Sequence, residues 1–122
     1  MFQLQNILYL SKIGHVLKRS IMLGEKIKLL RENLSISQRE LGAYIEVDAA
    51  FISKIEKGEK SINRKHLVII SQVLKTTESE LLTLWLADKV YKVIAEEELG
   101  LDALTIAEKK MDYNKSTQHE KD

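Results

Sequence analysis

The chain contains no proline and only five glycines in 122 residues. Proline interrupts a helix more strongly than any other residue and glycine comes next, so little in this sequence obstructs helices. The helix-favouring residues Leu, Ile, Lys and Glu are abundant. The predicted fold class is therefore all-α. At this length, with 44% hydrophobic and 30% charged residues, we expect one domain with appendages.

Charge divides the sequence into two parts. Residues 1–77 carry 13 Lys and Arg against 7 Asp and Glu, a net charge of +6, whereas residues 78–122 carry 6 against 11, a net charge of −5. A basic surface attracts a polyanion and an acidic one is repelled by it. The two parts are therefore predicted to have different tasks.

Features of an enzyme or a metal site are missing from the sequence. There is no cysteine, which suits a reducing cytoplasm. The histidines, His15, His66 and His119, are scattered without metal-type spacing. The stretch "GEKS" from Gly58 lacks the other glycine and the Gly-Lys pair of a phosphate-binding loop. We expect a cytoplasmic protein with no catalytic residues, no metal and no cofactor.

Residues 1–21 are expected to be an extension. Lys12, Lys18 and Arg19 interrupt or follow their apolar residues, unlike the leading charge of a secretory signal. The apolar run is also too short for a membrane span, so we expect no membrane contact. "MLGEKIKLLRENLSISQRE", from Met22, reads like a natural beginning. We expect residues 1–21 to lie upstream of the working start; the alternative is an amphipathic helix that docks on a partner.

Two short helices are predicted after a first helix of roughly Leu23 to Asn33. Ser37 begins "SQRE", a capping box with Glu40 that starts a helix running through about Ile45. Asp48 can cap a third helix, Ala49 to Lys57, which Gly58 ends. Two short helices joined by a turn of three or four residues form a helix-turn-helix.

Three further helices are predicted. Asn63 can cap a fourth helix, and Thr77 with Glu80 forms a second capping box that opens a fifth helix reaching about Ala95. A sixth helix is expected over roughly Leu101 to Asp112. The polar end, "NKSTQHEKD", has no apolar stripe and is predicted to be disordered.

The stretches "SQRELGAYI", "ISKIEKGEK" and "LVIISQVLKTTESELL" resemble, in order and spacing, the Cro and phage-repressor type (XRE-like) of helix-turn-helix regulators. The resemblance covers about Leu23 to Leu82. It implies a five-helix repressor-like helix-turn-helix domain with a C-terminal helical extension, and a sequence-specific regulator of transcription that binds double-stranded DNA. Gly42 departs from the family, which usually has alanine there. The expected domains are 1–21, an extension; 22–82, the DNA-binding domain; 83–112, a helical extension; and 113–122, a disordered tail.

The core is predicted from apolar residues at helical spacing. These residues are Ile27, Leu30, Leu41, Ile45, Ile52, Ile55, Leu67, Ile70 and Leu74. The resemblance also implies a buried ion pair between Arg31 and Glu56. The alternative is two solvated charges.

Two sets of DNA contacts are predicted. Phosphate contacts are expected from Gln38, Lys57, Lys60, Ser61, Asn63 and Arg64, with Arg39 either contacting phosphate or lying on an exposed face. Base contacts are expected from Ala49, Ala50, Phe51, Ser53 and Lys54, because Ile52 and Ile55 must face the core. For Phe51 we favour the groove edge, with core burial as the alternative. Each lysine could also simply be solvated.

The fifth helix is apolar nearly all round, so one of its faces needs a further surface. The sixth helix could fold back to cover this face within the chain, or pair with a second copy. We predict the second arrangement, a homodimer on an inverted-repeat operator. Its interface is predicted to contain Leu84, Trp85, Tyr91, Leu101, Leu104 and Met111. The alternative function is a protein-interaction module, such as an antitoxin or accessory subunit, that binds another protein through the same helices.

Overall fold

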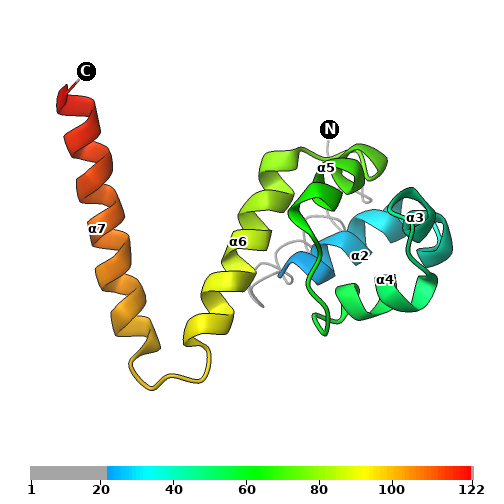
Figure 1. The fold of residues 1–122 in the computed structure, drawn as a ribbon, viewed down its shortest axis with the longest axis horizontal. Coiled ribbons are helices and arrows are strands. Elements are labelled where there is room, and N and C mark those ends of the chain that lie inside the picture. Colours follow the sequence, from blue (N-terminus) through cyan, green and yellow to red (C-terminus); the bar gives the residue numbers. More distant parts are fainter. Residues whose placement is uncertain (1–21, 122) are drawn as a thin grey trace, which may run out of the picture. The chain divides into compact units, whose positions relative to one another are not determined.

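The structure, a computed structural model, describes residues 22–121. The predicted extension over residues 1–21 lies outside the described residues. In order, the helices are α2 (Leu23–Asn33), α3 (Gln38–Tyr44), α4 (Ala49–Glu56), α5 (Arg64–Val73), α6 (Glu78–Ile94) and α7 (Gly100–Lys121) (Figure 1). No strand occurs within this range, so the predicted all-α fold class is confirmed. The chain forms two compact units, one reaching Leu86 and the other beginning at Ala87.

The first turns of α3, α4 and α5 are capped as the sequence predicts. Ser37 Oγ accepts a hydrogen bond from the backbone N–H of Glu40 at 3.0 Å, and the Glu40 carboxylate accepts one from the backbone N–H of Ser37 at 3.5 Å. Asp48 Oδ1 accepts from the backbone N–H of Phe51 at 2.8 Å, and Asn63 caps α5. Because these bonds are local, they fix where each helix begins.

The second predicted capping box is only half formed. Thr77 Oγ1 accepts from the backbone N–H of Glu80 at 3.2 Å. The Glu80 carboxylate lies with Lys26 Nζ of α2, at 2.8 Å, and accepts a hydrogen bond from the Thr76 hydroxyl, instead of returning to the backbone of Thr77. A charged donor gives a stronger hydrogen bond than a neutral amide. The predicted second capping box is therefore corrected: Thr77 caps α6, but Glu80 pairs with Lys26 and so joins α6 to α2.

Each of the four helices α2 to α5 is followed, directly after its C-cap, by a residue with positive φ. These residues are Ser35 (56°), Glu46 (59°), Gly58 (77°) and Lys75 (57°). Ile36, which follows Ser35, donates its backbone N–H to the carbonyl oxygen of Arg31 at 3.1 Å. Val47, which follows Glu46, donates its backbone N–H to the carbonyl oxygen of Gly42 at 2.9 Å. Only one of the four is glycine, the residue that adopts this conformation without a steric cost. Packing of the flanking helices therefore has to hold the other three.

The core lies among α2 to α6. Eight of the nine predicted core residues are buried, and Leu30 is only half-buried. Three buried hydrophobic residues were not in the predicted set: Leu23, Ile62 and Leu81. Ile62 comes from the segment between α4 and α5 and Leu81 from α6, so the core also holds this segment and the first part of α6 in place.

Two glycines allow the backbone of α4 to approach its neighbours closely. A Cβ atom at Gly24 in α2 would lie 2.4 Å from the carbonyl oxygen of Ile55, near the end of α4. A Cβ atom at Gly42 in α3 would lie 2.5 Å from the carbonyl oxygen of Val47, in the turn before α4. Both distances are shorter than van der Waals contact, so α4 is fixed at both ends by positions that accept no side chain.

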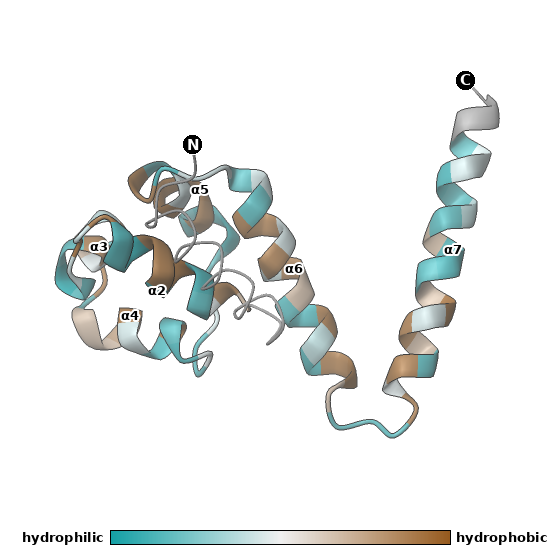
Figure 2. Ribbon diagram, turned by 180° about the vertical axis from the view of Figure 1, so that it is seen from behind, coloured by the Kyte–Doolittle hydropathy of each residue, from teal (hydrophilic) through white to brown (hydrophobic). Residues whose placement is uncertain are grey.

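The second unit contains the end of α6 and the whole of α7. Figure 2 shows apolar residues in the first turns of α7 and mainly polar residues toward its end. The tail predicted from residue 113 onward belongs, as far as Lys121, to α7. The sequence after Gly100 contains neither proline nor glycine to end a helix. Within the described residues, no helix is both long and apolar enough to cross a membrane.

Candidate nucleic-acid interface

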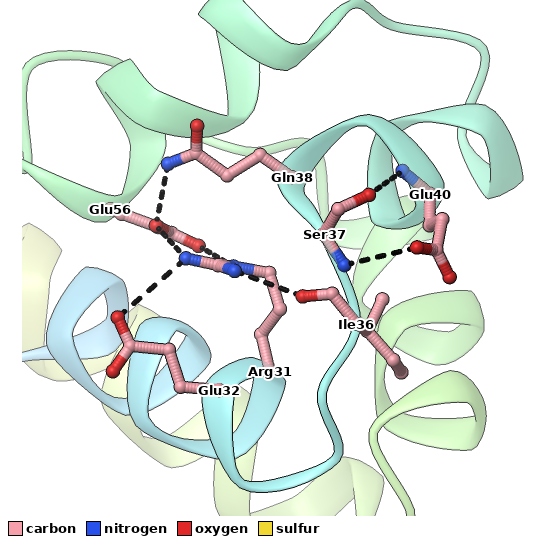
Figure 3. Close-up of polar contacts among 7 residues, drawn as sticks. All are labelled: Arg31, Glu32, Ile36, Ser37, Gln38, Glu40 and Glu56. Carbon is pink, nitrogen blue, oxygen red and sulfur yellow. Dashed lines mark hydrogen bonds and ion pairs between the residues drawn. The ribbon is translucent and has the colours of Figure 1, made fainter.

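A buried ion pair fixes the end of α4. Arg31 Nε donates to Glu56 Oε2 at 2.7 Å and Arg31 Nη2 donates to Glu56 Oε1 at 3.1 Å. Arg31 Nη1 donates to the carbonyl oxygen of Ile36 at 2.9 Å (Figure 3). The pair expected from the sequence is therefore present, with both residues buried. The hydrogen bond to Glu56 raises the pKa of Arg31, so its charge is retained.

Gln38 belongs to the same network, which the sequence did not predict. Its side-chain nitrogen Nε2 donates to Glu56 Oε1 at 3.0 Å (Figure 3). The predicted role for Gln38 was a phosphate contact, but one of its N–H bonds serves Glu56 in the structure. The partners are 18 residues apart, so no local pattern could have revealed the contact. The network joins α2, the turn after it, α3 and α4.

The two faces of α4 differ in chemistry. Ile52, Ile55 and Glu56 are buried. Ala50, Lys54 and Lys57 are exposed on and just after the helix, and Ala49 and Ser53 are half-buried. The exposed side therefore offers small side chains, a hydroxyl and two ammonium groups.

Phe51 is half-buried, packed against the core cluster. Lys60 Nζ lies 5.6 Å from the centroid of its ring, within the range of a cation–π contact. Of the two placements considered for Phe51, the structure shows partial burial. Its ring also holds the side chain of Lys60 beside α4.

The remaining predicted phosphate contacts lie on exposed positions. Lys57, Lys60 and Ser61 are exposed between α4 and α5, and Arg64 is exposed at the start of α5. Asn63 is exposed as well, and its side-chain oxygen accepts from the backbone N–H of Lys65 at 2.9 Å. Arg39 is exposed on α3. The structure thus gathers the cations after α4 into one continuous stretch of chain.

Comparison with known proteins identifies the family of this chain. The model of a family described as helix-turn-helix matches residues 27–81. Control protein C.MunI from Mycoplasma sp is 39% identical over 62 residues, which make up 50% of this chain and 84% of that protein. The chain belongs to the Cro and phage-repressor type of helix-turn-helix family. The crystal structure of the P22 c2 repressor protein in complex with synthetic operator 9T in the presence of Tl+ is 31% identical, covers 51% of this chain and 94% of that chain, and has a TM-score of 0.48.

The family is one of DNA-binding regulators, and its helix-turn-helix corresponds here to α3, the turn after it and α4. The ion-pair network and the two close glycine contacts hold these two helices, and the exposed side of α4 carries Ser53 and Lys54. The position of α4 against α2 and α3 is therefore fixed by these contacts.

Two residues predicted for a dimer interface serve the helix-turn-helix domain itself. Leu84 and Trp85 are half-buried against the core. Trp85 Nε1 donates to the carbonyl oxygen of Ile62 at 2.8 Å, across 23 residues of chain. The hydrogen-bond partner of Trp85 could not be identified from the sequence, because the two residues are brought together only by the packing of α6. The other four, Tyr91, Leu101, Leu104 and Met111, are exposed.

Proposed function

We propose that this protein is a sequence-specific DNA-binding regulator of transcription and that α4 is its recognition helix. The observation that carries the proposal is the two-sided character of α4. One side is locked into the core by Ile52, Ile55 and Glu56, and the other presents Ser53 and Lys54. A helix of this kind fits the major groove of B-DNA with its polar side toward the base edges.

Base reading is assigned to the segment of α4 from Ala49 to Lys54. Lys54 can donate to guanine O6 or N7, and Ser53 can donate to or accept from several bases. The methyl groups of Ala49 and Ala50 permit close approach and can pack on a thymine methyl. Phe51, packed on the core, is proposed to contribute only its exposed edge.

Phosphate binding is assigned to the exposed residues after α4, which we name the phosphate clamp. The clamp comprises Lys57, Lys60, Ser61, Asn63 and Arg64. Such contacts position a protein on the duplex without reading its sequence. Gln38 and Arg39 at the start of α3 are proposed to contact phosphate on the other side of the recognition helix, with Gln38 using the N–H that Glu56 does not accept.

A homodimer on an inverted repeat is the second part of the proposal. Two recognition helices related by a twofold axis can enter successive major grooves about 34 Å apart. Tyr91, Leu101 and Met111 are exposed apolar residues, at 58%, 79% and 72% of their full accessibility. Burial of such side chains between two copies would remove apolar surface from water. Family membership and the similarity to a control protein also support a regulator, for which the cytoplasm is the expected compartment.

Selection of bound sequences from random double-stranded DNA, repeated at several salt concentrations, tests the function. We expect an inverted repeat among the selected sequences. Lys54→Ala should relax the preference at one or two base pairs, because it removes a base contact. Lys60→Ala should weaken binding to all DNA sequences alike and reduce the salt dependence of the affinity. Binding without enrichment, and with a steep salt dependence, would contradict sequence-specific reading.

A protein-interaction module remains the second candidate. The exposed apolar residues of α7 and of the end of α6 favour it, because another protein could cover the same surface. Sedimentation of the pure protein at micromolar concentration separates the two. A clean monomer would count against the homodimer and favour a different protein as partner.

A further inference from the structure

The phosphate clamp is a stretch of irregular backbone held at both ends. Near α4, the backbone N–H groups of Glu59 and Lys60 both donate to the carbonyl oxygen of Lys54, at 2.9 and 3.3 Å. Near α5, the Asn63 side chain caps the helix. Those bonds fix the ends of the clamp, so its middle requires an anchor of its own.

That anchor is Ile62, held by its side chain and its carbonyl group. The side chain is buried in the core, with 4% of its surface exposed. The carbonyl oxygen accepts the indole N–H of Trp85 in α6 at 2.8 Å. Ser61 and Asn63, on either side, are exposed. The backbone on which these two clamp residues are mounted is therefore fixed by Trp85.

We propose that Trp85 is a positioning residue for DNA binding: through the carbonyl group of Ile62 it holds the phosphate clamp in the arrangement that phosphates require. This inference rests on the proposed function. Trp85 itself touches no DNA in this account, since its ring is packed against the core.

Loss of the indole donor has a defined consequence. The carbonyl oxygen of Ile62 would lose its partner, and the middle of the segment, between Ser61 and Asn63, would be held by the Ile62 side chain alone. DNA binding would then have to order the clamp as well as contact it. Phosphate contacts carry no sequence information, so the affinity should fall for every sequence while the base preference stays the same.

Trp85→Phe, measured in the full-length protein with a DNA duplex selected by the wild type, tests the proposal. Phenylalanine keeps an aromatic ring and removes the N–H donor. We expect the dissociation constant to rise by about three- to tenfold, the size expected for one hydrogen bond, with an unchanged preference among sequences. Because Trp85 is the only tryptophan, incorporation of benzothienylalanine in place of tryptophan removes the donor while keeping the shape of the ring system, and it should have the same effect.

Leu82→Ala is the matched control, since Leu82 is also half-buried against the core in α6. Both variants are compared at a temperature where both are folded. An equal loss of affinity in Leu82→Ala would overturn the proposal, because the loss would then reflect general loosening of α6. An unchanged affinity in Trp85→Phe, or a changed base preference, would also overturn it. If the wild type binds no DNA at all, the proposed function fails first.

The wild-type protein offers a measurement that does not depend on the variant folding. A single tryptophan gives a single indole N–H resonance in a ¹⁵N correlation spectrum. Contact of the clamp with phosphates should shift this resonance during titration with the selected duplex and slow the exchange of its proton with water. A resonance that stays in place through saturation of the DNA would overturn the proposal.

Discussion

The helix-turn-helix domain and α7 use the same kinds of side chain in opposite surroundings. In the domain, charged Arg31 and Glu56 are buried, and apolar Ile52 packs in the core. In α7, apolar Leu101 and Met111 are exposed beside charged residues. The domain thus satisfies its buried charges and its apolar side chains internally. The α7 helix displays side chains whose burial would require another surface.

Under the proposed dimer, the difference separates residues that specify the fold from residues that specify association. A substitution in the buried network should reduce the free energy of unfolding of the domain. A substitution on α7 should leave that free energy alone and weaken association. Variants in the two regions should therefore differ in which quantity they change, the unfolding free energy or the dimer dissociation constant.

The largest expected effect is in Glu56→Ala. Removal of the carboxylate leaves the Arg31 guanidinium buried without its main partner, which should cost about 3–5 kcal/mol of unfolding free energy. Denaturation in urea, followed by circular dichroism, measures this. The matched control is Glu32→Ala, because Glu32 is exposed and lies 3.9 Å from the same guanidinium. The control should cost no more than about 1 kcal/mol. Equal losses in the two variants would mean that burial of the pair is unimportant.

Gly42→Ala should also destabilise the domain, by about 1–3 kcal/mol, because the added methyl group meets the carbonyl oxygen of Val47. Helix propensity alone predicts the opposite sign, a gain of about 1 kcal/mol. Thermal unfolding of the variant decides between them, with Gln72→Ala on the exposed side of α5 as the control. A more stable Gly42→Ala protein would show that the turn before α4 moves away easily, and α4 would then be less firmly held than described.

Met111→Glu on α7 should weaken association and leave the unfolding free energy of the domain unchanged. Met111 is exposed, so the first unit should unfold as in the wild type, whereas the dimer dissociation constant should rise at least about tenfold, or about 1.4 kcal/mol. Sedimentation at several concentrations measures the association. Asn114→Glu adds the same charge to an exposed position of the same helix and controls for repulsion alone. An unchanged dimer dissociation constant would mean that Met111 is not part of the interface.

The boundaries of α2 to α5 and the caps of α3 to α5 could be predicted from the sequence because they depend on near neighbours. The Ser37 capping box and the Asp48 cap each join residues three positions apart, and the buried face of each helix follows its 3.6-residue period. The Arg31–Glu56 pair came from the resemblance to a family, since its residues are 25 positions apart.

The contacts that sequence reasoning missed all depend on how the helices pack. The hydrogen bonds from Gln38 to Glu56 and from Trp85 to Ile62 can form only when α3, α4 and α6 are packed together. Glu80 does not complete the predicted capping box because α2 places Lys26 Nζ 2.8 Å from its carboxylate. The close approach at Gly42 has the same origin, since the turn that excludes a Cβ atom lies in the following segment.

The smallest expected effect concerns Glu80, which joins α6 to α2 at the surface of the domain. Hydrogen bonds from Lys26 and Thr76 hold the pKa of Glu80 below its ordinary value of 4.5. A carboxyl group with a lowered pKa in the folded state stabilises the fold at every pH above its unfolded pKa, and this contribution disappears as the pH falls through the folded pKa. Because the side chain is 45% exposed, solvent screening limits the contribution to less than about 0.5 kcal/mol. Glu80→Gln should therefore lower the unfolding free energy slightly at pH 7 and not at all well below pH 4. Paired urea titrations at the two pH values measure the difference, and an equal loss at both would assign the contact to packing instead of charge.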